Sequence, residues 1–232
     1  MTPIRLITFD LDNTLWDVEP VIVRADAAMH NWLAQAHPEW KALAHADFLA
    51  CRREAWELLV EQRHNMTALR ITTLEIALAQ CGISDEQAQL SARAAFAVFY
   101  AERNNITLFD DAIEMLQTLA NRYDLHAISN GNADITKMPI APYFRANFSA
   151  ESVGAAKPDP APFLAALKYA GVSPSGAVHV GDHPEQDVAA AQAVGIRAIW
   201  FNPQRAAWPL AGKPDAEVHA LADLAEAITS LN

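Results

Sequence analysis

Two carboxylates follow directly after an apolar run near the start of the sequence. The run 6–9 is typical of a buried strand, and Asp10 and Asp12 come after it, two positions apart. Side chains at i and i+2 of an extended segment point to the same side, so both acids are expected to face one place. Close carboxylates repel each other unless a cation lies between them or one is protonated. The pair therefore predicts metal or acid–base chemistry, with an Asp-rich turn as the alternative.

A second polar segment follows the apolar run 125–128. Ser129, Asn130 and Gly131 supply a hydroxyl, an amide and a glycine turn with exposed backbone N–H groups. Such groups can hold phosphate oxygens, which makes these three residues candidates for phosphate binding. An ordinary strand-to-loop turn has the same composition and remains the alternative.

A third candidate is Lys157, which stands among small residues just before a helix expected to begin at Pro160. Its single charge, placed among carboxylates, would neutralise both an acid and a phosphate. Taken alone, the pattern favours a surface lysine.

Two more acids follow the apolar run 177–180. Asp182 ends that run, and Asp187 lies early in the next helix. Asp10, Asp12 and Asp182 are expected to converge on a hard cation, and Mg²⁺ takes carboxylate oxygens together with a substrate phosphate oxygen. Asp187 has a simpler alternative as an acid at a helix N-terminus, where the helix dipole favours negative charge.

Other chemically capable side chains lack the spacing of ligands. Cys51 and Cys81 have neither metal-ligand spacing nor a disulfide framework, so we expect buried free thiols. His179 and His183 are expected to be structural or to face solvent. These residues therefore add no competing site to the acidic cluster.

The order of elements predicts how the candidate residues are positioned. Residues 20–104 show apolar stripes at spacings of three and four, which predict a bundle of four amphipathic helices. From residue 108, strand and helix patterns alternate, which predicts a Rossmann-like parallel sheet covered by helices on both faces. We therefore expect an α/β core of residues 1–16 and 105–232, with residues 17–104 inserted as an all-helical cap. Strands are expected at residues 6–9, 125–128, 146–149, 177–180, 196–201 and near 218.

Composition narrows the classes of partner. The 232 residues are 52% hydrophobic, enough for a sizeable core, and carry a net charge of −11. This charge argues against nucleic acid or an anionic membrane as the main partner. No apolar run approaches the roughly 20 residues that span a bilayer, and no signal-peptide pattern is present at the start. We expect a cytoplasmic monomer or homodimer.

Together the segments resemble, in the same order along the chain, the four motifs of the haloacid dehalogenase-like hydrolase superfamily. The helical block resembles the C1-type cap of that superfamily, and the resemblance spans nearly the whole chain. The matching segments are Asp-Leu-Asp-Asn-Thr at 10–14, Ser-Asn-Gly at 129–131, Lys157, and Gly181-Asp182 with Asp187.

The resemblance implies a catalytic pair and a metal. Asp10 would attack phosphorus and form an aspartyl-phosphate, and Asp12 would protonate the leaving alcohol and then activate water. Mg²⁺ would be held by Asp10, by Asp12 through its backbone carbonyl, and by Asp182. True dehalogenases of the superfamily neither carry the second Asp nor require Mg²⁺, so Asp12 implies a phosphatase.

The resemblance also implies how the phosphate is bound. Ser129 and Lys157 would hold the phosphoryl group, with Asn130 and Gly131 in the same phosphate-binding segment. Asp187 would support the metal or Lys157. The expected substrate is a small phosphorylated metabolite.

Details beyond the motifs are similar to bacterial phosphatases that act on flavin mononucleotide and 5-amino-6-(5-phospho-D-ribitylamino)uracil. The similar segments are 9–17, 128–133 and 179–182. Such substrates carry a phosphate on a ribityl chain and a flat ring at the other end. Trp16, which follows the catalytic loop, is the candidate wall for this ring. A phosphosugar phosphatase, a mutase and a non-catalytic phosphometabolite-binding protein remain alternatives.

Overall fold

The computed structural model describes residues 2–232, which form two compact units. The first unit, which we call the core unit, combines the chain up to Asp17 with Thr107–Asn232. The second, the helical unit, is Val18–Ile106. These limits lie within two residues of the expected ones at 16/17 and 104/105.

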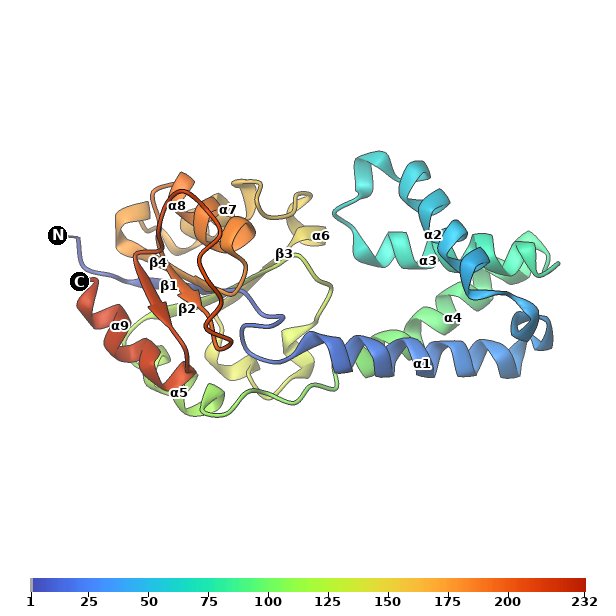
Figure 1. The fold of residues 1–232 in the computed structure, drawn as a ribbon, viewed down its shortest axis with the longest axis horizontal. Coiled ribbons are helices and arrows are strands. Elements are labelled where there is room, and N and C mark those ends of the chain that lie inside the picture. The colour runs from blue at the N-terminus through green and yellow to red at the C-terminus, as the bar shows by residue number, and fades with distance from the viewer. Residues whose placement is uncertain (1) are drawn as a thin grey trace. The chain divides into compact units, whose positions relative to one another are not determined.

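A six-stranded parallel sheet forms the centre of the core unit, in the order β3-β2-β1-β4-β5-β6. This confirms the predicted α/β fold class. The N- and C-terminal segments lie side by side (Figure 1), where the Ile4 N–H donates to Asn232 Oδ1 at 2.8 Å. The strands are β1 Leu6–Phe9, β2 Asp124–Ser129, β3 Ala146–Ser149, β4 Ala177–Gly181, β5 Arg197–Phe201 and β6 Ala216–Val218.

Helices cover both faces of this sheet (Figure 1), which explains why strand β1 is buried along its whole length. Helices α5 and α9 contact each other on one face, and α7 and α8 contribute side chains to the apolar core on the other. The helices of the core unit are α5 Ala112–Ala120, α6 Ala150–Val153, α7 Ala161–Ala170, α8 Ala190–Ala193 and α9 Leu224–Ser230.

The register of the central strands brings three chain segments to one edge of the sheet. Strand β1 lies between β2 and β4, and Phe9 is paired with Ala127 on one side and Val180 on the other. All three strands run in the same direction, so their carboxyl ends lie next to one another. Residues that follow these strands therefore meet there, at the edge where open α/β sheets bind ligands.

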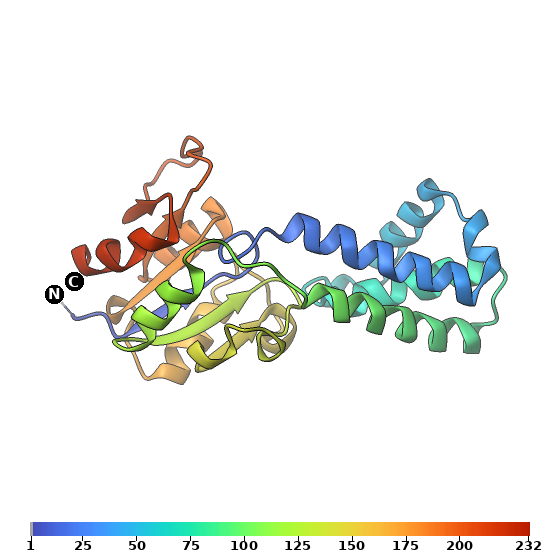
Figure 2. The ribbon, with the colours of Figure 1, turned by 90° about the horizontal axis from the view of Figure 1, so that it is seen from below.

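The helical unit has an apolar core of its own. Helices α1 and α4 pack along each other (Figure 2), and α3 contacts both α2 and α4. Cys51 is a buried free thiol as expected, whereas Cys81, also free, is partly exposed at the end of α3. No helix in the described part of the chain has the length and apolarity to cross a membrane. The helices are α1 Val18–Ala36, α2 His45–Leu58, α3 Met66–Gln80 and α4 Asp85–Arg103.

We predict that two adjacent residues of α7 respond very differently to truncation. Phe163 is 0% exposed and packs in the apolar core of the core unit, whereas Leu164 is 50% exposed. Phe163→Ala should lower the free energy of unfolding by about 3–5 kcal/mol, because it leaves a cavity. Leu164→Ala should change it by no more than about 0.5 kcal/mol. Urea unfolding measures both, and equal losses would contradict the assigned core.

Candidate active site

The segment after β1 forms a tight loop that begins at Asp10. The Asp10 N–H donates to the Val180 carbonyl at 2.9 Å, which holds this residue against strand β4. The loop closes because the Leu15 N–H donates to the Leu11 carbonyl at 2.8 Å, and Asn13 takes a left-handed conformation with φ of 61°. Thr14 thereby turns back, and its hydroxyl donates to Asp10 Oδ2 at 3.1 Å.

Asp12 points to a different partner from the one that its spacing suggested. The Trp16 indole N–H donates to Asp12 Oδ1 at 2.9 Å, and the backbones of the two residues form a bridge. Trp16 is 0% exposed, so the expectation that it offers a wall to substrate is wrong. Its ring is buried, and its N–H holds the Asp12 carboxylate in place.

The buried ammonium of Lys157 connects the nucleophile candidate to the rest of the site. Its Nζ donates to Asp10 Oδ1 at 2.7 Å, to Asp187 Oδ1 at 2.5 Å and to the Ile128 carbonyl at 3.0 Å. An ammonium has three N–H donors, so these contacts use all of them. Lys157 is thus an internal cation, and the alternative of a surface lysine is wrong.

The segment after β2 positions this lysine. The Asn130 side chain accepts from the Lys157 N–H at 2.7 Å and donates to the Lys157 carbonyl at 2.8 Å. The hydroxyl of buried Ser129 accepts from the Gly131 N–H at 3.0 Å. The Asn130 amide and the Gly131 N–H, both predicted to bind phosphate, therefore make contacts within the protein in this structure.

A group of buried residues around Asp187 was not predicted as part of the site. His179 Nε2 lies 3.2 Å from Asp187 Oδ1, and its Nδ1 lies 2.8 Å from the Thr8 hydroxyl. Burial lowers the pKa of His179, and a neutral ring carrying its hydrogen on Nε2 satisfies both contacts. The expectation of a structural histidine fits this position. Side chains alternate between the two faces along β4, so His179 and Gly181 share one face. This alternation is the sequence signal that could have placed His179 near the site.

Gly181 makes room for the Asp187 carboxylate. A Cβ at position 181 would lie 2.3 Å from Asp187 Cγ, closer than any real contact. The backbone of the π-helical segment Pro184–Ala189 carries Asp187 back over the end of β4, and the His183 N–H donates to Asp187 Oδ2 at 2.9 Å. The carboxylate is thus fixed by backbone, lysine and histidine together.

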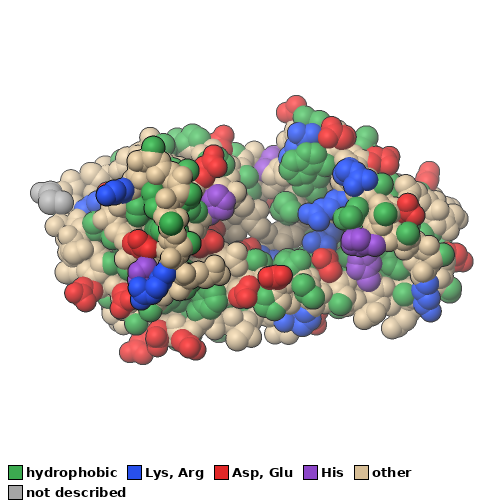
Figure 3. Space-filling model, in the orientation of Figure 1, with side chains coloured by type: hydrophobic (Ala, Val, Ile, Leu, Met, Phe, Trp, Pro, Cys, Tyr) green, Lys and Arg blue, Asp and Glu red, His purple; other side chains and the backbone are tan. Residues whose placement is uncertain are grey.

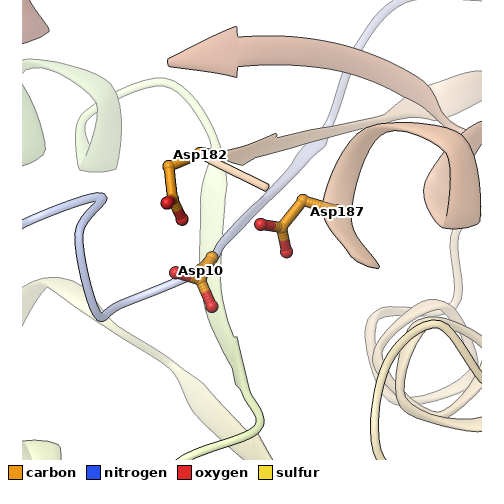
Figure 4. Close-up of side chains that lie close together, drawn as sticks. All are labelled: Asp10, Asp182 and Asp187. Carbon is orange, nitrogen blue, oxygen red and sulfur yellow. The ribbon is translucent and has the colours of Figure 1, made fainter. Parts of the chain in front are cut away.

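The three acids that meet at this edge of the sheet differ from the predicted three in one member (Figure 4). Oxygens of Asp10, Asp182 and Asp187 all lie within 4.8 Å of one another. Asp187 takes the place expected for the Asp12 carboxylate, because that carboxylate is bound to Trp16 instead. The Thr14 hydroxyl lies between Asp10 and Asp182, at 3.1 and 3.4 Å.

The surroundings of these three acids shift their pKa values in different directions. Burial raises the pKa of Asp10 to about 8, an effect that Lys157 opposes and Asp187 and Asp182 reinforce. Burial and the charge of Asp187 raise the pKa of Asp182 to about 6. Burial alone would raise the pKa of Asp187, but Lys157 and His179 hold it below its usual range. One lysine therefore does not neutralise the cluster.

The donor set fits a hard divalent cation. Asp10 and Asp182 face each other with raised pKa values, while Lys157 contacts Asp10 and Asp187 only. A cation between Asp10 and Asp182 would relieve their repulsion and keep both ionised near neutral pH. Mg²⁺ binds one or two carboxylate oxygens in such sites and takes water and substrate phosphate oxygens as its other ligands.

Residues 4–195 match the sequence profile of the haloacid dehalogenase-like hydrolases. The chain belongs to this family. The match includes all the segments that supply Asp10, Ser129, Lys157 and Asp182, as well as the helical unit.

Among relatives of this hydrolase, the Escherichia coli K12 5-amino-6-(5-phospho-D-ribitylamino)uracil phosphatase YigB is 31% identical over 97% of this chain and 96% of that protein. The Streptococcus pneumoniae R6 pyrimidine 5'-nucleotidase PynA is 26% identical over 97% of this chain and 94% of that protein. A crystal structure of a protein named 2-haloacid dehalogenase, from Pseudomonas syringae pv. tomato DC3000, is 42% identical. It superimposes with a TM-score of 0.96 and covers 99% of this chain and 100% of that one.

We predict that Gly181→Ala damages the site of this hydrolase through sterics alone. The added methyl group overlaps Asp187 at 2.3 Å, so the carboxylate must move away from Lys157 and His179. Unfolding free energy should fall by about 1–3 kcal/mol, and turnover should fall with it. Gly212→Ala is the matched control, because a Cβ there has nothing within 4 Å. Unchanged turnover in Gly181→Ala would show that the position of Asp187 does not matter.

Proposed function

We propose that this family member is a Mg²⁺-dependent phosphatase that hydrolyses small phosphomonoesters through an aspartyl-phosphate on Asp10. The observation that carries the proposal is the setting of this carboxylate. Asp10 lies at the end of β1, 7% exposed, with Lys157 Nζ at 2.7 Å and the Thr14 hydroxyl at 3.1 Å. A buried, oriented carboxylate beside a cation is suited to attack an electrophile directly.

In the first step, an Asp10 oxygen forms a bond to phosphorus and the substrate alcohol leaves. Lys157 offsets charge at the attacking group because its ammonium contacts Asp10 Oδ1. Water then attacks the aspartyl-phosphate, which restores the Asp10 carboxylate and releases phosphate. Splitting the hydrolysis into two displacements replaces one difficult step with two easier ones.

Asp12 is the proposed acid–base group. It is two residues from the nucleophile and half-buried, and Trp16 holds one of its carboxylate oxygens. In this role the Asp12 carboxyl donates a proton to the leaving alcohol and later takes one from water. Such positioned proton transfer contributes on the order of 10²–10⁴ in rate.

Ser129 and Lys157 are the proposed phosphate-binding residues, and Asn130 is the residue that positions Lys157. Ser129 ends β2 beside β1, and Lys157 reaches the same edge through its side chain. Asn130 binds both backbone groups of Lys157, so it sets where the ammonium can reach. Asp10, the backbone carbonyl of Asp12 and Asp182 would hold Mg²⁺, which neutralises charge on the transferring phosphoryl group when bound.

The proposed substrates carry a pyrimidine-type ring. The relatives aligned over nearly the full chain include a phosphatase named for a ribitylaminouracil phosphate and a pyrimidine 5'-nucleotidase. Flavin mononucleotide and 5-amino-6-(5-phospho-D-ribitylamino)uracil share a phosphate on a ribityl chain and a ring with two carbonyl groups. These two compounds are therefore the first substrates to test.

A second candidate reaction is dehalogenation of a 2-haloacid, the activity for which the 42% identical protein of known structure is named. Asp10 could displace a halide from carbon by the same kind of attack. A halide, however, leaves as a stable anion and needs neither a proton nor a divalent cation. The Asp12 carboxylate and the cluster of Asp10, Asp182 and Asp187 therefore favour phosphoryl transfer.

We predict that Asp10→Asn abolishes phosphatase activity and keeps the fold, because the amide preserves shape and removes the attacking charge. Removal of a nucleophile costs on the order of 10⁶ in another hydrolase, so kcat on flavin mononucleotide should fall by several orders of magnitude. Exposed Asp223→Asn, in the same unit, is the control and should retain activity. Near-normal turnover by folded Asp10→Asn would refute the nucleophile assignment.

We also predict that metal removal separates the two candidate reactions. A chelator should abolish hydrolysis of flavin mononucleotide, and Mg²⁺ should restore it, whereas Ca²⁺ should restore it poorly because its shell is larger and looser. Chloride release from 2-chloropropionate should stay at background throughout. Chelator-resistant chloride release without phosphate release would identify the protein as a dehalogenase instead.

A further inference from the structure

The peptide unit that joins Asp182 to His183 is held at both of its polar groups by side chains. Its carbonyl, which belongs to Asp182, accepts from the Trp200 indole N–H at 2.7 Å. Its N–H, which belongs to His183, donates to Asp187 Oδ2 at 2.9 Å. A peptide unit is planar and has only these two polar groups, so the two hydrogen bonds together fix its orientation.

This peptide lies where regular structure ends. The pairing between β4 and β5 stops at Gly181, which lies opposite Trp200, and the π-helical segment Pro184–Ala189 begins three residues later. Asp182 is therefore outside both the strand ladder and the helical segment. The Trp200 side chain supplies a hydrogen bond to the first carbonyl beyond the paired part of β4.

The Asp182 carboxylate needs a fixed backbone because it faces other negative charge. Its oxygens and those of Asp10 and Asp187 all lie within 4.8 Å of one another. The three donors of Lys157 are used on Asp10, Asp187 and a backbone carbonyl, and Asp182 accepts a long hydrogen bond of 3.4 Å from the Thr14 hydroxyl. Like charges at this separation repel, so a free Asp182 would turn away from the other two acids.

Trp200 is packed firmly enough to act as an anchor. It lies on β5, is 4% exposed and belongs to the same apolar core as Phe163. The ring of Trp208 packs edge-on against it, with the ring centroids 5.0 Å apart. Trp208 lies in the loop between β5 and β6, which crosses the front of the core unit in Figure 1. On this face, hydrophobic side chains are interspersed with charged ones (Figure 3), as is usual for a surface that faces water.

A simpler account makes Trp200 a core-filling residue whose N–H finds an acceptor by chance. Buried indole N–H groups usually have a hydrogen-bond partner. In the neighbouring ring, however, Trp208 Nε1 is buried and makes no hydrogen bond with any residue that the structure describes. The two rings are in contact, and the one that bonds to Asp182 can be compared directly with the one that bonds to nothing described.

We propose that Trp200 is a positioning residue for the divalent cation site, and that it acts through the Asp182 carbonyl to hold the Asp182 carboxylate toward Asp10. Groups that orient the ligands of a metal typically contribute about 10–100-fold to metal affinity. The proposal rests on the Mg²⁺ site of the function proposed above, but the anchored peptide itself needs neither metal nor substrate.

The first experiment measures metal affinity without substrate. Mn²⁺ suits the same oxygen ligands as Mg²⁺, and electron paramagnetic resonance measures how much Mn²⁺ stays free. Trp200→Phe keeps an aromatic ring and removes the N–H, so it should bind Mn²⁺ about tenfold more weakly than wild type. Trp208→Phe is the matched control and should bind Mn²⁺ like wild type. Wild-type affinity in Trp200→Phe, or an equal loss in both variants, would overturn the proposal.

An isosteric analogue removes the donor without leaving a cavity in the core. 3-Benzothienylalanine incorporated in place of Trp200 keeps the bicyclic shape and has a sulfur atom where the indole has its N–H. It should lose Mn²⁺ affinity as Trp200→Phe does, with thermal unfolding close to that of wild type. If Trp200→Phe does not fold, this analogue decides, and wild-type affinity in the analogue would overturn the proposal.

A metal-free measurement separates this inference from the proposed function. Without the Trp200 donor, hydrogen exchange at the His183 N–H should be about tenfold faster than in Trp208→Phe, as expected for the loss of one hydrogen bond. If wild type binds no Mn²⁺ but this difference is found, the anchor stands and the metal-dependent function is wrong. If wild type binds Mn²⁺ and hydrolyses phosphate esters but both variants match in exchange and affinity, the anchor is wrong and the phosphatase stands.

Discussion

The Lys157 ammonium, buried between Asp10 and Asp187, is the interaction on which the rest of the site depends. A buried charge is costly unless it is paired and hydrogen-bonded, and all three of its donors are used, two on carboxylates and one on the Ile128 carbonyl. Removing either acid would leave an uncompensated charge in the interior. The same ammonium also contacts Asp10, the proposed nucleophile, so one ion pair contributes both to stability and to the proposed chemistry.

Backbone architecture makes that arrangement possible. Parallel strands β2, β1 and β4 end at one edge, and each end contributes a different part of the site. The absent side chain at Gly181 admits Asp187, and the Asn130 amide fixes the backbone of Lys157 across 27 residues of sequence. One cation still leaves Asp10 and Asp182 facing each other with raised pKa values, which is why the cluster suits a divalent ion.

The helical unit is a separate structural element. Its core is independent of the sheet, and one pocket within it is lined by aromatic, guanidinium and carboxylate groups.

The sequence by itself determined the parallel α/β fold, because alternating strand and helix patterns with short links allow few other arrangements. It also made Asp10 and Asp182 candidates, because polar residues after buried parallel strands must meet at one edge, and Lys157 a candidate because it stands among small residues just before a helix. Tertiary structure decided the rest. Spacing put Asp12 with Asp10, but the Trp16 indole draws its carboxylate away, and Asp187 joins the cluster instead. Trp16 is buried, and packing sets the contacts of His179 with Thr8 and Asp187. Periodicity predicts the face of a helix or strand from which a side chain projects. The residue that this side chain contacts is decided by segments distant in the chain.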